Sequence, residues 1–262
     1  MNKVVIITGG SSGIGYATAN HFSQKNYIVY EFSRKGISRD GVKHLTCDVT
    51  KEDECISAVE YVINESKRID IIINNAGFGI SGAIEFTDME SAKRLFDVNF
   101  FGTHNVIKAS LKYLKESKGR IINVSSVGGV LYLPFQAFYS ASKAATNALT
   151  LALRNEVKNY GVSVCAVLPG DVKTGFTKAR EKSLDGEKEY GGRIERSVSL
   201  MEKDEQGGMT PDFVAKKIYK VGKKKRVKPM YTVGFKYKLF TVLNKILPSR
   251  LVNYIVYLIY AR

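Results

Sequence analysis

The chain has 262 residues, of which 44% are hydrophobic, so it can bury one large core, and we expect a single domain over residues 1–262. Its formal net charge of +15 is uneven, because residues 213–262 hold 13 lysines and arginines and no acid. No zinc-finger spacing, helix-turn-helix pattern or RNA-binding aromatic motif accompanies this charge, which argues against nucleic acid as a partner. The basic C-terminal part is therefore a solvated tail, or a surface for anionic lipid or an acidic ligand or partner.

The beginning of the chain and its cysteines favour a cytoplasmic protein. The apolar run 4-VVIITGG-10 is too short for a secretory signal and ends in a glycine turn. The three cysteines lack CxxC spacing, which fits reduced structural thiols, and the three histidines form no metal motif. We therefore expect no metal site and a cytoplasmic location, with peripheral membrane contact through the basic tail as an open alternative.

Short β-branched runs alternate with longer amphipathic stretches along the chain. Near-continuous apolar strands joined by helices need crossover connections, so the pattern predicts a doubly wound parallel α/β sheet, a Rossmann fold of about seven strands with helices on both faces. Thr210 and Pro211 are the expected N-cap and first residue of one helix. Strands are expected at residues 4–8, 27–33, 70–74, 120–125, 162–169 and 227–233, and helices at residues 14–25, 51–67, 92–117, 140–160 and 210–220.

Two segments depart from this alternation. Residues 171–208 are rich in charge and glycine, which is typical of a mobile flap over a substrate site and equally of a surface insertion. Residues 235–262 are an amphipathic C-terminal extension, which Pro248 should divide into two helices. The last apolar run, residues 251–261, is about half of the ~20 residues that span a bilayer. Three roles stay open for this extension: binding in the membrane interface, covering the substrate entrance, or packing against a second subunit.

The segment 8-TGGSSGIG-15 connects the first strand to the first helix. Its glycines are spaced GxxxGxG instead of GxGxxG, but they equally permit a tight turn and let a pyrophosphate approach the positive end of the helix dipole. The position at a strand-to-helix turn predicts a nucleotide site. The expected contacts are Gly9, Ser11, Ser12, Gly13, Ile14 and Gly15.

The end of the second strand, 30-YEFSRKG-36, bears on the choice between NAD and NADP. A carboxylate at this point binds the ribose 2′-hydroxyl of NAD, whereas an arginine pairs with the 2′-phosphate of NADP. Here Ser33 and Arg34 stand at the tip without an acid, which favours NADP(H) over NAD(H). Glu31 points to the same strand face as Ser33, and would reverse the preference if it reached the ribose.

The stretch 139-YSASK-143 places Tyr139 and Lys143 four residues apart, on one face of the expected helix. A lysine ammonium beside a phenol favours the ionised form and lowers its pKa from about 10. A general acid or base works best when its pKa lies near the operating pH. The pair therefore indicates a tyrosine prepared for proton transfer.

Seven motifs, in order over residues 3 to about 235, together resemble the short-chain dehydrogenase/reductase family in its compact one-domain branch. Residues 126–145 are most similar to 17β-hydroxysteroid and retinol dehydrogenases. The resemblance implies a nicotinamide-dependent oxidoreductase that acts on CH–OH groups, and a homodimer or homotetramer. The motifs are 8-TGGSSGIG-15, 47-CDVT-50, 74-NNAG-77, Asn99 in 97-DVNFFG-102, Ser126, 139-YSASK-143 and 169-PGDVKT-174.

The resemblance implies a catalytic set of Asn99, Ser126, Tyr139 and Lys143. Tyr139 exchanges a proton with the substrate oxygen, and Ser126 hydrogen-bonds the same oxygen. Lys143 shifts the pKa of Tyr139 and holds the cofactor ribose, while Asn99 holds a water in a proton relay. Ser125 competes for the serine role, but neighbouring strand residues point to opposite sides, and the offset of thirteen residues from Tyr139 selects Ser126.

The resemblance also implies further cofactor contacts. Asp48 would hydrogen-bond the adenine amino group, the alternative being an aspartate that caps a helix. Asp171, directly after Gly170, is more polar than expected for its position. The other implied contacts are Val49, Asn75, Ala76, Gly77, Pro169, Gly170, Val172 and Thr174, together with Tyr139 and Lys143.

The substrate pocket is expected outside the carboxyl ends of the strands. Its candidates are largely apolar and favour a small lipophilic substrate such as a steroid, a retinoid or a long acyl chain. The leading hypothesis is an NADP(H)-dependent oxidoreductase that interconverts a ketone and a secondary alcohol. The alternatives are a 3-oxoacyl thioester reductase, whose acidic carrier would suit the basic C-terminal part, and a non-catalytic NADP-binding regulator or scaffold, which would not need the catalytic set. The candidates are Val130, Leu131, Tyr132, Leu133, Pro134, Phe135 and Phe176.

Overall fold

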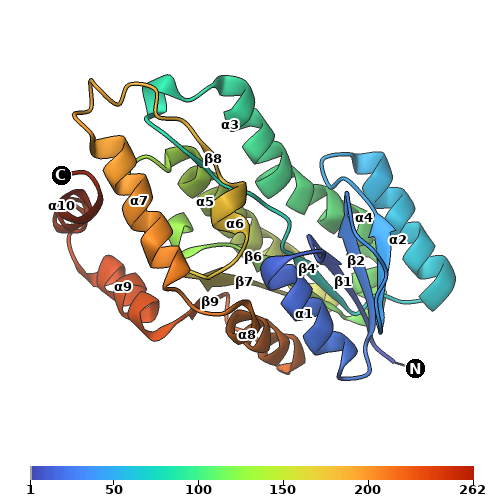
Figure 1. Cartoon of the computed structure of the whole chain (residues 1–262). Coiled ribbons are helices and arrows are strands. Elements are labelled where there is room, and N and C mark those ends of the chain that lie inside the picture. Colours follow the sequence, from blue (N-terminus) through green and yellow to red (C-terminus); the bar gives the residue numbers. More distant parts are fainter. Residues whose placement is uncertain (1) are drawn as a thin grey trace.

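Seven parallel strands form the central sheet of the computed structural model, which describes residues 2–262 (Figure 1). Their order is β3-β2-β1-β4-β6-β7-β9, so the chain winds outward from β1 in both directions and the predicted doubly wound Rossmann fold is confirmed. The strands are β1 Val4–Thr8, β2 Ile28–Ser33, β3 Val42–Thr46, β4 Ile71–Asn74, β6 Arg120–Val124, β7 Ser163–Pro169 and β9 Met230–Val233, with a separate parallel pair β5 Ile80–Ser81 and β8 Glu181–Lys182.

Helices cover both faces of the sheet. Alternate strand residues point to opposite faces, so Val5 and Ile7 pack under α1 and α8, while Val4 and Ile6 pack under α2, α4 and α5. Both layers of the core are therefore apolar. The helices are α1 Gly13–Ser23, α2 Glu52–Ser66, α3 Met89–Phe96, α4 Gly102–Ser117, α5 Ala137–Glu156, α6 Phe176–Ala179, α7 Arg193–Gln206, α8 Pro211–Lys223, α9 Phe235–Ile246 and α10 Ser249–Tyr260.

The segment expected as one helix over residues 92–117 is instead two helices joined by a π-helical turn at Asp97–Phe101. The hydroxyls of Thr103 and Thr146 donate to the carbonyl of Asn99 at 3.0 and 3.4 Å. Because a hydroxyl from α5 takes part, the turn depends on tertiary packing, and helical periodicity alone did not reveal it. The structure also adds β3, an edge strand that was not among the expected elements.

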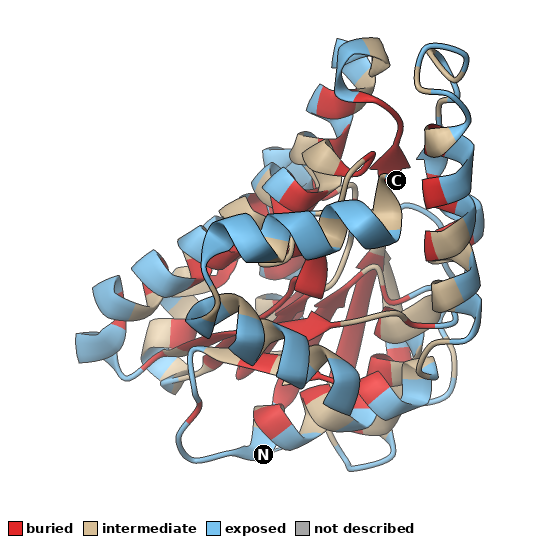
Figure 2. Cartoon of the chain, turned by 90° about the vertical axis from the view of Figure 1, so that its left-hand side faces the viewer, coloured by how far each residue is buried: buried red, intermediate tan, exposed pale blue. Residues whose placement is uncertain are grey.

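Local sequence signals correctly located two other helix boundaries. The hydroxyl of Thr210 accepts the N–H of Phe213 at 3.2 Å, and Pro211 begins α8, as predicted. Pro248 separates α9 from α10, also as predicted. Neither of these last two helices contains a buried residue (Figure 2). Among residues 2–262, no helix is long and apolar enough to cross a membrane.

Arg120 of β6 joins the sheet to the end of α8. Its guanidinium is buried and donates to the carbonyls of Val221, Gly222 and Lys224 at 2.6, 2.6 and 2.5 Å. Val221 and Gly222 belong to the last turn of α8 and Lys224 directly follows it, where carbonyls lack the usual partners further along a helix. One side chain therefore fixes where α8 ends against the sheet.

We expect Arg120→Met to lower the free energy of unfolding by about 3 kcal/mol, because it removes the three hydrogen bonds that the buried guanidinium donates to the end of α8. Urea unfolding followed by circular dichroism measures the change, with Lys93→Met on the exposed face of α3 as the control. A variant as stable as the parent chain would contradict the proposed role of Arg120 in holding α8.

Candidate active site

A cavity of about 810 Å³ lies at the carboxyl ends of β1, β4, β6 and β7. It extends from the glycine loop after β1 to the inner sides of α9 and α10, and its volume is in the usual range for a ligand site. Most of the expected site residues line it. They are Gly9, Ser11, Ser12, Gly13, Ile14, Asn75, Ala76, Gly77, Ser126, Tyr139, Lys143, Pro169, Gly170, Val172 and Thr174.

The glycine loop is held against the end of β4 by close backbone contacts. Gly9 has a φ of +65°, and a Cβ on Gly15 would lie 2.2 Å from the carbonyl oxygen of Gly9. The side-chain amide of Asn75 donates to the carbonyls of Thr8 and Gly9 at 3.1 and 3.3 Å. The chain therefore turns sharply here and brings the first turn of α1 to the cavity.

The residues at the start of α1 fit a dinucleotide. The N-cap Ser12 makes no side-chain capping bond, and the first turn contains no acid. The unpaired N–H groups of a helix start, with the positive end of its dipole, bind phosphate. Because Gly15 also leaves no space for a side chain, this loop matches the requirements of a bound pyrophosphate.

Ser126 and Tyr139 face each other across the cavity. The Oγ of Ser126 accepts the N–H of Gly128 at 3.0 Å, which fixes its orientation. Burial raises the pKa of Tyr139 to about 12, and its hydrogen bond with Ser126 acts in the opposite direction. Ser125 instead donates to the carbonyl of Lys143 at 3.2 Å. The geometry thus pairs Ser126, and not Ser125, with the tyrosine.

Lys143 is buried one turn further along α5, where its Nζ donates to the carbonyl of Val124 at 3.1 Å. Burial lowers its pKa to about 8. Its Nζ lies 5.9 Å from the centre of the Tyr139 ring, and no hydrogen bond joins the two side chains. In the protein alone the pKa of Tyr139 rises, opposite to the expected fall, because burial is the largest influence on it and the Lys143 ammonium is not among the charges that shift it.

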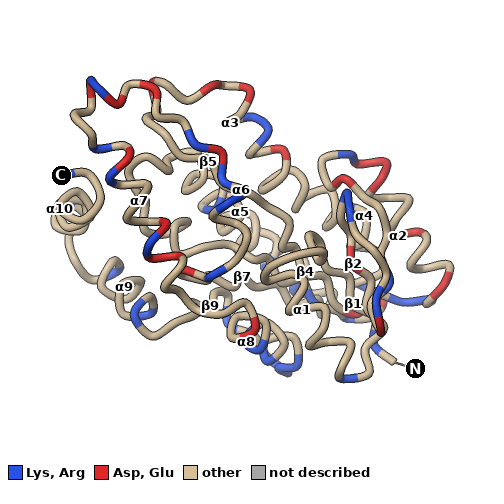
Figure 3. Tube along the Cα trace, in the orientation of Figure 1, with Lys and Arg blue, Asp and Glu red and all other residues tan. Residues whose placement is uncertain are grey.

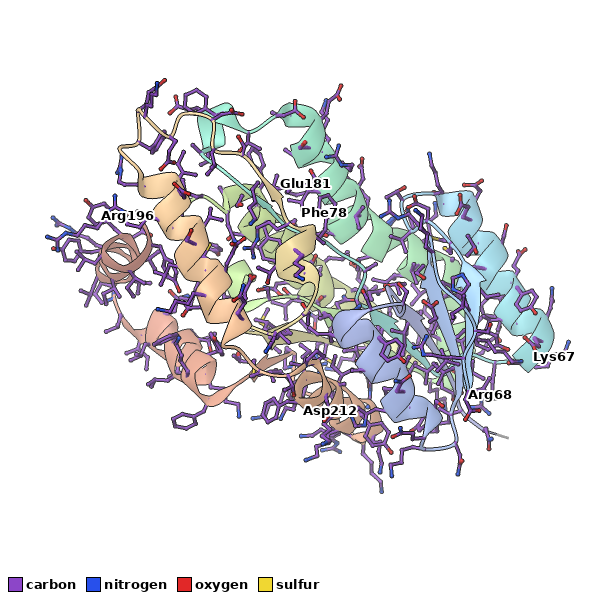
Figure 4. The ribbon with its side chains drawn as sticks, in the orientation of Figure 1. Lys67, Arg68, Phe78, Glu181, Arg196 and Asp212 are labelled. Carbon is purple, nitrogen blue, oxygen red and sulfur yellow. The ribbon has the colours of Figure 1, made fainter. Side chains whose placement is uncertain are left out.

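Asn99 is held by the chain around it. Its side chain accepts the N–H of Phe78 at 3.1 Å, and donates to the carbonyl of Phe78 at 3.0 Å and to the hydroxyl of Ser142 at 3.1 Å. Figure 4 labels Phe78, the residue that Asn99 holds. The next residue, Gly79, accepts the N–H of Glu181 through its carbonyl at 3.0 Å. Asn99 does not line the cavity and joins the end of β4 to α5, so this geometry gives it a positioning role.

The residues expected at the adenine end lie outside the cavity. Ser33 and Arg34 stand at the carboxyl end of β2, where Arg34 is exposed. The carboxylate of Asp48 accepts the N–H and the hydroxyl of Thr50 at 3.0 and 2.9 Å, which forms a turn before α2, whose N-cap is Lys51, so Asp48 does not cap this helix. Val49 packs in the core.

Glu31 lies beneath the glycine loop and is fully buried. Its carboxylate pairs with Nδ1 of His44 at 2.5 Å and accepts the hydroxyl of Ser33 at 3.3 Å. Besides Arg34, a second arginine, Arg39, lies beside the glycine loop, and the sequence did not indicate it. Arg39 stacks 4.1 Å above the ring of Tyr16 and donates to the carbonyl of Gly10 at 3.1 Å. No local motif marks Arg39, because folding alone brings it back to the loop.

The apolar half of the cavity differs from the expected one. Leu131, Leu133 and Phe176 line it, whereas Tyr132 is 62% exposed and Phe135 packs against Tyr190. Val130 and Pro134 are likewise absent from the lining. The C-terminal helices supply most of this apolar wall. The sequence indicated that they are amphipathic, but not which of their residues face the cavity. These are Tyr237, Phe240, Leu243, Asn244, Leu247, Val252, Ile255, Val256, Ile259 and Tyr260.

Two carboxylates line this half of the cavity. Asp171 accepts the hydroxyl of Tyr237, which ties α9 to the loop after β7, and burial raises the pKa of Asp171. Glu205 of α7 accepts from the guanidinium of Arg180 and from the hydroxyl of Thr177. The Glu205 charge raises the pKa of Tyr139, so it lies within electrostatic reach of the phenol.

Comparison with known proteins gives consistent matches. A family model described as short chain dehydrogenase matches residues 3–185. The 3-ketodihydrosphingosine reductase of Bacteroides thetaiotaomicron is 40% identical, over 99% of this chain and 98% of its own. Among solved structures, a short-chain dehydrogenase from Streptomyces avermitilis has a TM-score of 0.85 at 26% identity, over 94% of this chain and 93% of its own. The structure titled ElxO with NADP Bound has a TM-score of 0.75 at 27% identity, over 91% of this chain and all of its own.

We expect Lys143→Met to raise the free energy of unfolding by about 2 kcal/mol at pH 7. Burial lowers the pKa of Lys143 from its usual 10.5 to about 8, and each pKa unit is worth about 1.4 kcal/mol. The substitution removes this penalty, on the order of 3 kcal/mol, and loses one hydrogen bond worth about 1 kcal/mol.

The penalty is fully present below pH 8, where both the folded and the unfolded chain carry the charge. It falls as the pH rises from about 8 toward 10.5, because the folded chain loses its proton first. The stability gain of the variant should therefore shrink over this range in urea unfolding at several pH values. Lys93→Met, on exposed α3, should show no such trend, and a pH-independent gain in Lys143→Met would contradict a buried charge.

Proposed function

Because the chain belongs to the short-chain dehydrogenase/reductase family and is an oxidoreductase of ketone and CH–OH groups, we propose that it interconverts a long-chain 2-amino ketone and its secondary alcohol with NADP(H). One observation carries the proposal. Tyr139 and Ser126 line a single cavity, which also contains the glycine loop after β1 and an apolar wall from α9 and α10.

Three catalytic residues and the positioning residue Asn99 each have a defined task in this proposal. The bound nicotinamide supplies or accepts the hydride. Tyr139, whose phenol stays protonated at neutral pH, donates its proton to the carbonyl oxygen during reduction. Ser126 hydrogen-bonds the same oxygen and stabilises the charge that develops on it. Lys143 brings a positive charge to the reaction centre below its pKa of about 8, and Asn99 holds α5 in position through Ser142.

The wall of the cavity supports a long apolar substrate that carries one amine. Helices α9 and α10 have 12 residues each, so each is about 18 Å long, and both present apolar side chains to the cavity. Glu205 supplies a carboxylate near Tyr139 that already pairs with Arg180 and accepts from Thr177, so an ammonium next to the reacting carbonyl would share this carboxylate with Arg180. The relative from Bacteroides is named for 3-ketodihydrosphingosine, a compound of this class. An apolar wall alone would suit a steroid or a retinoid equally well, whereas Glu205 favours the amine.

The segment 171–208 fits the role of a substrate flap in this proposal. It contains α6, β8 and α7, and the ring of Phe176 lies 5.7 Å from that of Tyr139. The buried ion pair of Arg180 with Glu205 ties the beginning of the flap to its end. Movement of this segment would therefore open the cavity beside the catalytic tyrosine.

NADP(H) is the proposed cofactor for reasons that lie at the end of β2. Arg34 is exposed there, Arg39 stands beside the glycine loop, and the carboxylate of Glu31 is buried against His44. An exposed arginine pairs with a 2′-phosphate, while an acid paired with histidine beneath the loop is poorly placed to accept a 2′-hydroxyl. The structure titled ElxO with NADP Bound supports the same choice.

A substrate panel tests the proposed reaction. We expect NADPH oxidation to be fastest with 3-ketodihydrosphingosine, about 10-fold or more slower with its N-acetylated form, and slow with a steroid ketone, retinal and an acetoacetyl thioester, because only the first offers a charged amine to Glu205. Tyr139→Phe should lower kcat by 10²- to 10⁴-fold, since it removes the proton donor.

Tyr132→Phe is the matched control, because this tyrosine is exposed and does not line the cavity. It should behave as the parent enzyme. A lack of turnover with the whole panel, or a Tyr139→Phe variant as fast as the parent, would overturn the proposed reaction. Equal rates with the free and the acetylated amine would overturn only the role of Glu205.

A second experiment tests the cofactor. Arg34→Ala should lower kcat/KM for NADPH by roughly 10- to 100-fold and leave that for NADH nearly unchanged, because the lost charge-assisted hydrogen bond is worth about 1.5–3 kcal/mol. Arg196→Ala, on the exposed face of α7, is the control. If the parent prefers NADH and Glu31→Gln removes that preference, then Glu31 determines the cofactor and the proposed role of Arg34 is wrong.

A further inference from the structure

The outer side of α9 is apolar although it faces solvent. Phe235 and Ile246 are 86% and 72% exposed, and Leu239 and Val242 between them are about half exposed. Their spacing of four, three and four residues places them on one side of the helix. The opposite side, with Phe240 and Leu243, lines the cavity. This helix is thus apolar both toward the protein and away from it.

The same pattern continues in α10. Leu251, Tyr254 and Leu258 lie on its exposed side, while Val252 and Val256 line the cavity. The exposed sides of α9 and α10 are both apolar, and we call them together the outer face; both helices lie in front in Figure 2. Single exposed apolar residues need no explanation, but seven of them on two successive helices mark a contact site.

Basic residues accompany the outer face on its α8 and α9 side, while Asp204 of α7 lies next to Tyr260 of α10. Lys238 and Lys245 lie within α9, and Arg250 begins α10 beside them. The lysines of α8 continue the same basic surface, because Lys217 is close enough to Lys238 for the two charges to repel, which contributes to a lowered pKa of Lys217. Figure 3 shows blue without red along α9, and red in α8 only at its start. That acid is Asp212, which is paired with His21 and Lys216.

A second copy of this chain is a poor occupant for the outer face. In a two-fold dimer the same patch meets itself, so the basic residues of both copies would come together. Residues 213–262 contain no acid that could pair with them. The charge instead requires an anionic partner, and the apolar patch requires one that offers hydrocarbon.

We propose that the outer face of α9 and α10 docks on an anionic lipid bilayer, with its apolar side chains in the interface and the basic residues of α8, α9 and α10 at the headgroups. Helices that are apolar on the buried side and rich in lysine at the edges lie in this way in the plane of the interface. The binding itself does not depend on the proposed reaction. Because the same helices form the wall of the cavity, docking would bring the cavity next to the lipid from which a long-chain ketone would come, and this part rests on the proposed function.

Vesicle flotation tests the docking without any turnover. The full chain should float with phosphatidylcholine vesicles that contain phosphatidylglycerol at about 0.1 M salt. Flotation should fall strongly at about 1 M salt, where the Debye length decreases from about 10 Å to about 3 Å. Pure phosphatidylcholine vesicles should carry much less protein, because the basic residues then have no anionic headgroups to meet.

Two double variants separate the electrostatic from the hydrophobic contribution to lipid binding. Lys238→Gln with Lys245→Gln should weaken binding to anionic vesicles about 30-fold, at about 1 kcal/mol for each lysine near the surface. Leu239→Gln with Ile246→Gln should weaken it at least 10-fold. None of these four residues lines the cavity. The matched control is Lys51→Gln at the start of α2 together with Lys93→Gln on α3, and this variant should bind as the parent chain does.

Thermal unfolding must be unchanged in each variant, so that lost binding is not lost folding. The proposal is overturned if the parent does not float with anionic vesicles, or if the control variant loses binding as much as the other two. It is also overturned if light scattering shows a dimer that Leu239→Gln with Ile246→Gln dissociates while the parent ignores lipid, because the outer face is then a contact between copies. Failure of the substrate panel leaves these outcomes unaffected.

Discussion

The site depends on a close backbone approach at the end of β1, where no methyl group fits between Gly15 and the carbonyl of Gly9. This contact lets the chain turn directly from strand to helix and places the start of α1 above the sheet. The amide of Asn75 then bridges the two carbonyls at the end of β1, so β4 ends beside the same loop. Since β6 and β7 run parallel to them, their residues reach the same edge. Gly15 thus allows the glycine loop and the side chains of Ser126 and Tyr139 to share one cavity.

The reaction centre is built at the expense of stability. Lys143 keeps a buried amine with one backbone partner, and Tyr139 keeps a partly buried phenol, where an apolar pair would be more stable. Both stand on α5, a helix of 20 residues that packs against the sheet, and Asn99 ties this helix to the end of β4. Rigid elements therefore hold groups that the core would otherwise exclude.

The sequence was sufficient where a signal is local. The doubly wound parallel sheet follows from alternating apolar runs, Thr210 caps α8 and Pro211 begins it, and Ser126, Tyr139 and Lys143, selected by their spacing, line one cavity. It was insufficient where contacts are distant. The edge strand β3 is half exposed and lacks an apolar run, and the π-helical turn at Asn99 uses a hydroxyl 47 residues away. Tyr237 meets Asp171 across 66 residues, and the direction of the Tyr139 pKa depends on burial, which spacing does not reveal.

Because α9 and α10 contain no buried residue, they contribute to the shape of the cavity but little to the stability of the fold. Elements with few buried contacts open locally, at free energies well below that of global unfolding. Amide hydrogens in these helices should therefore exchange with solvent long before those of the central sheet. Substitutions in them can reshape the cavity wall while leaving the folding equilibrium nearly unchanged. Substrate range and thermodynamic stability are thus encoded in different parts of the chain, and the first can diverge without loss of the second.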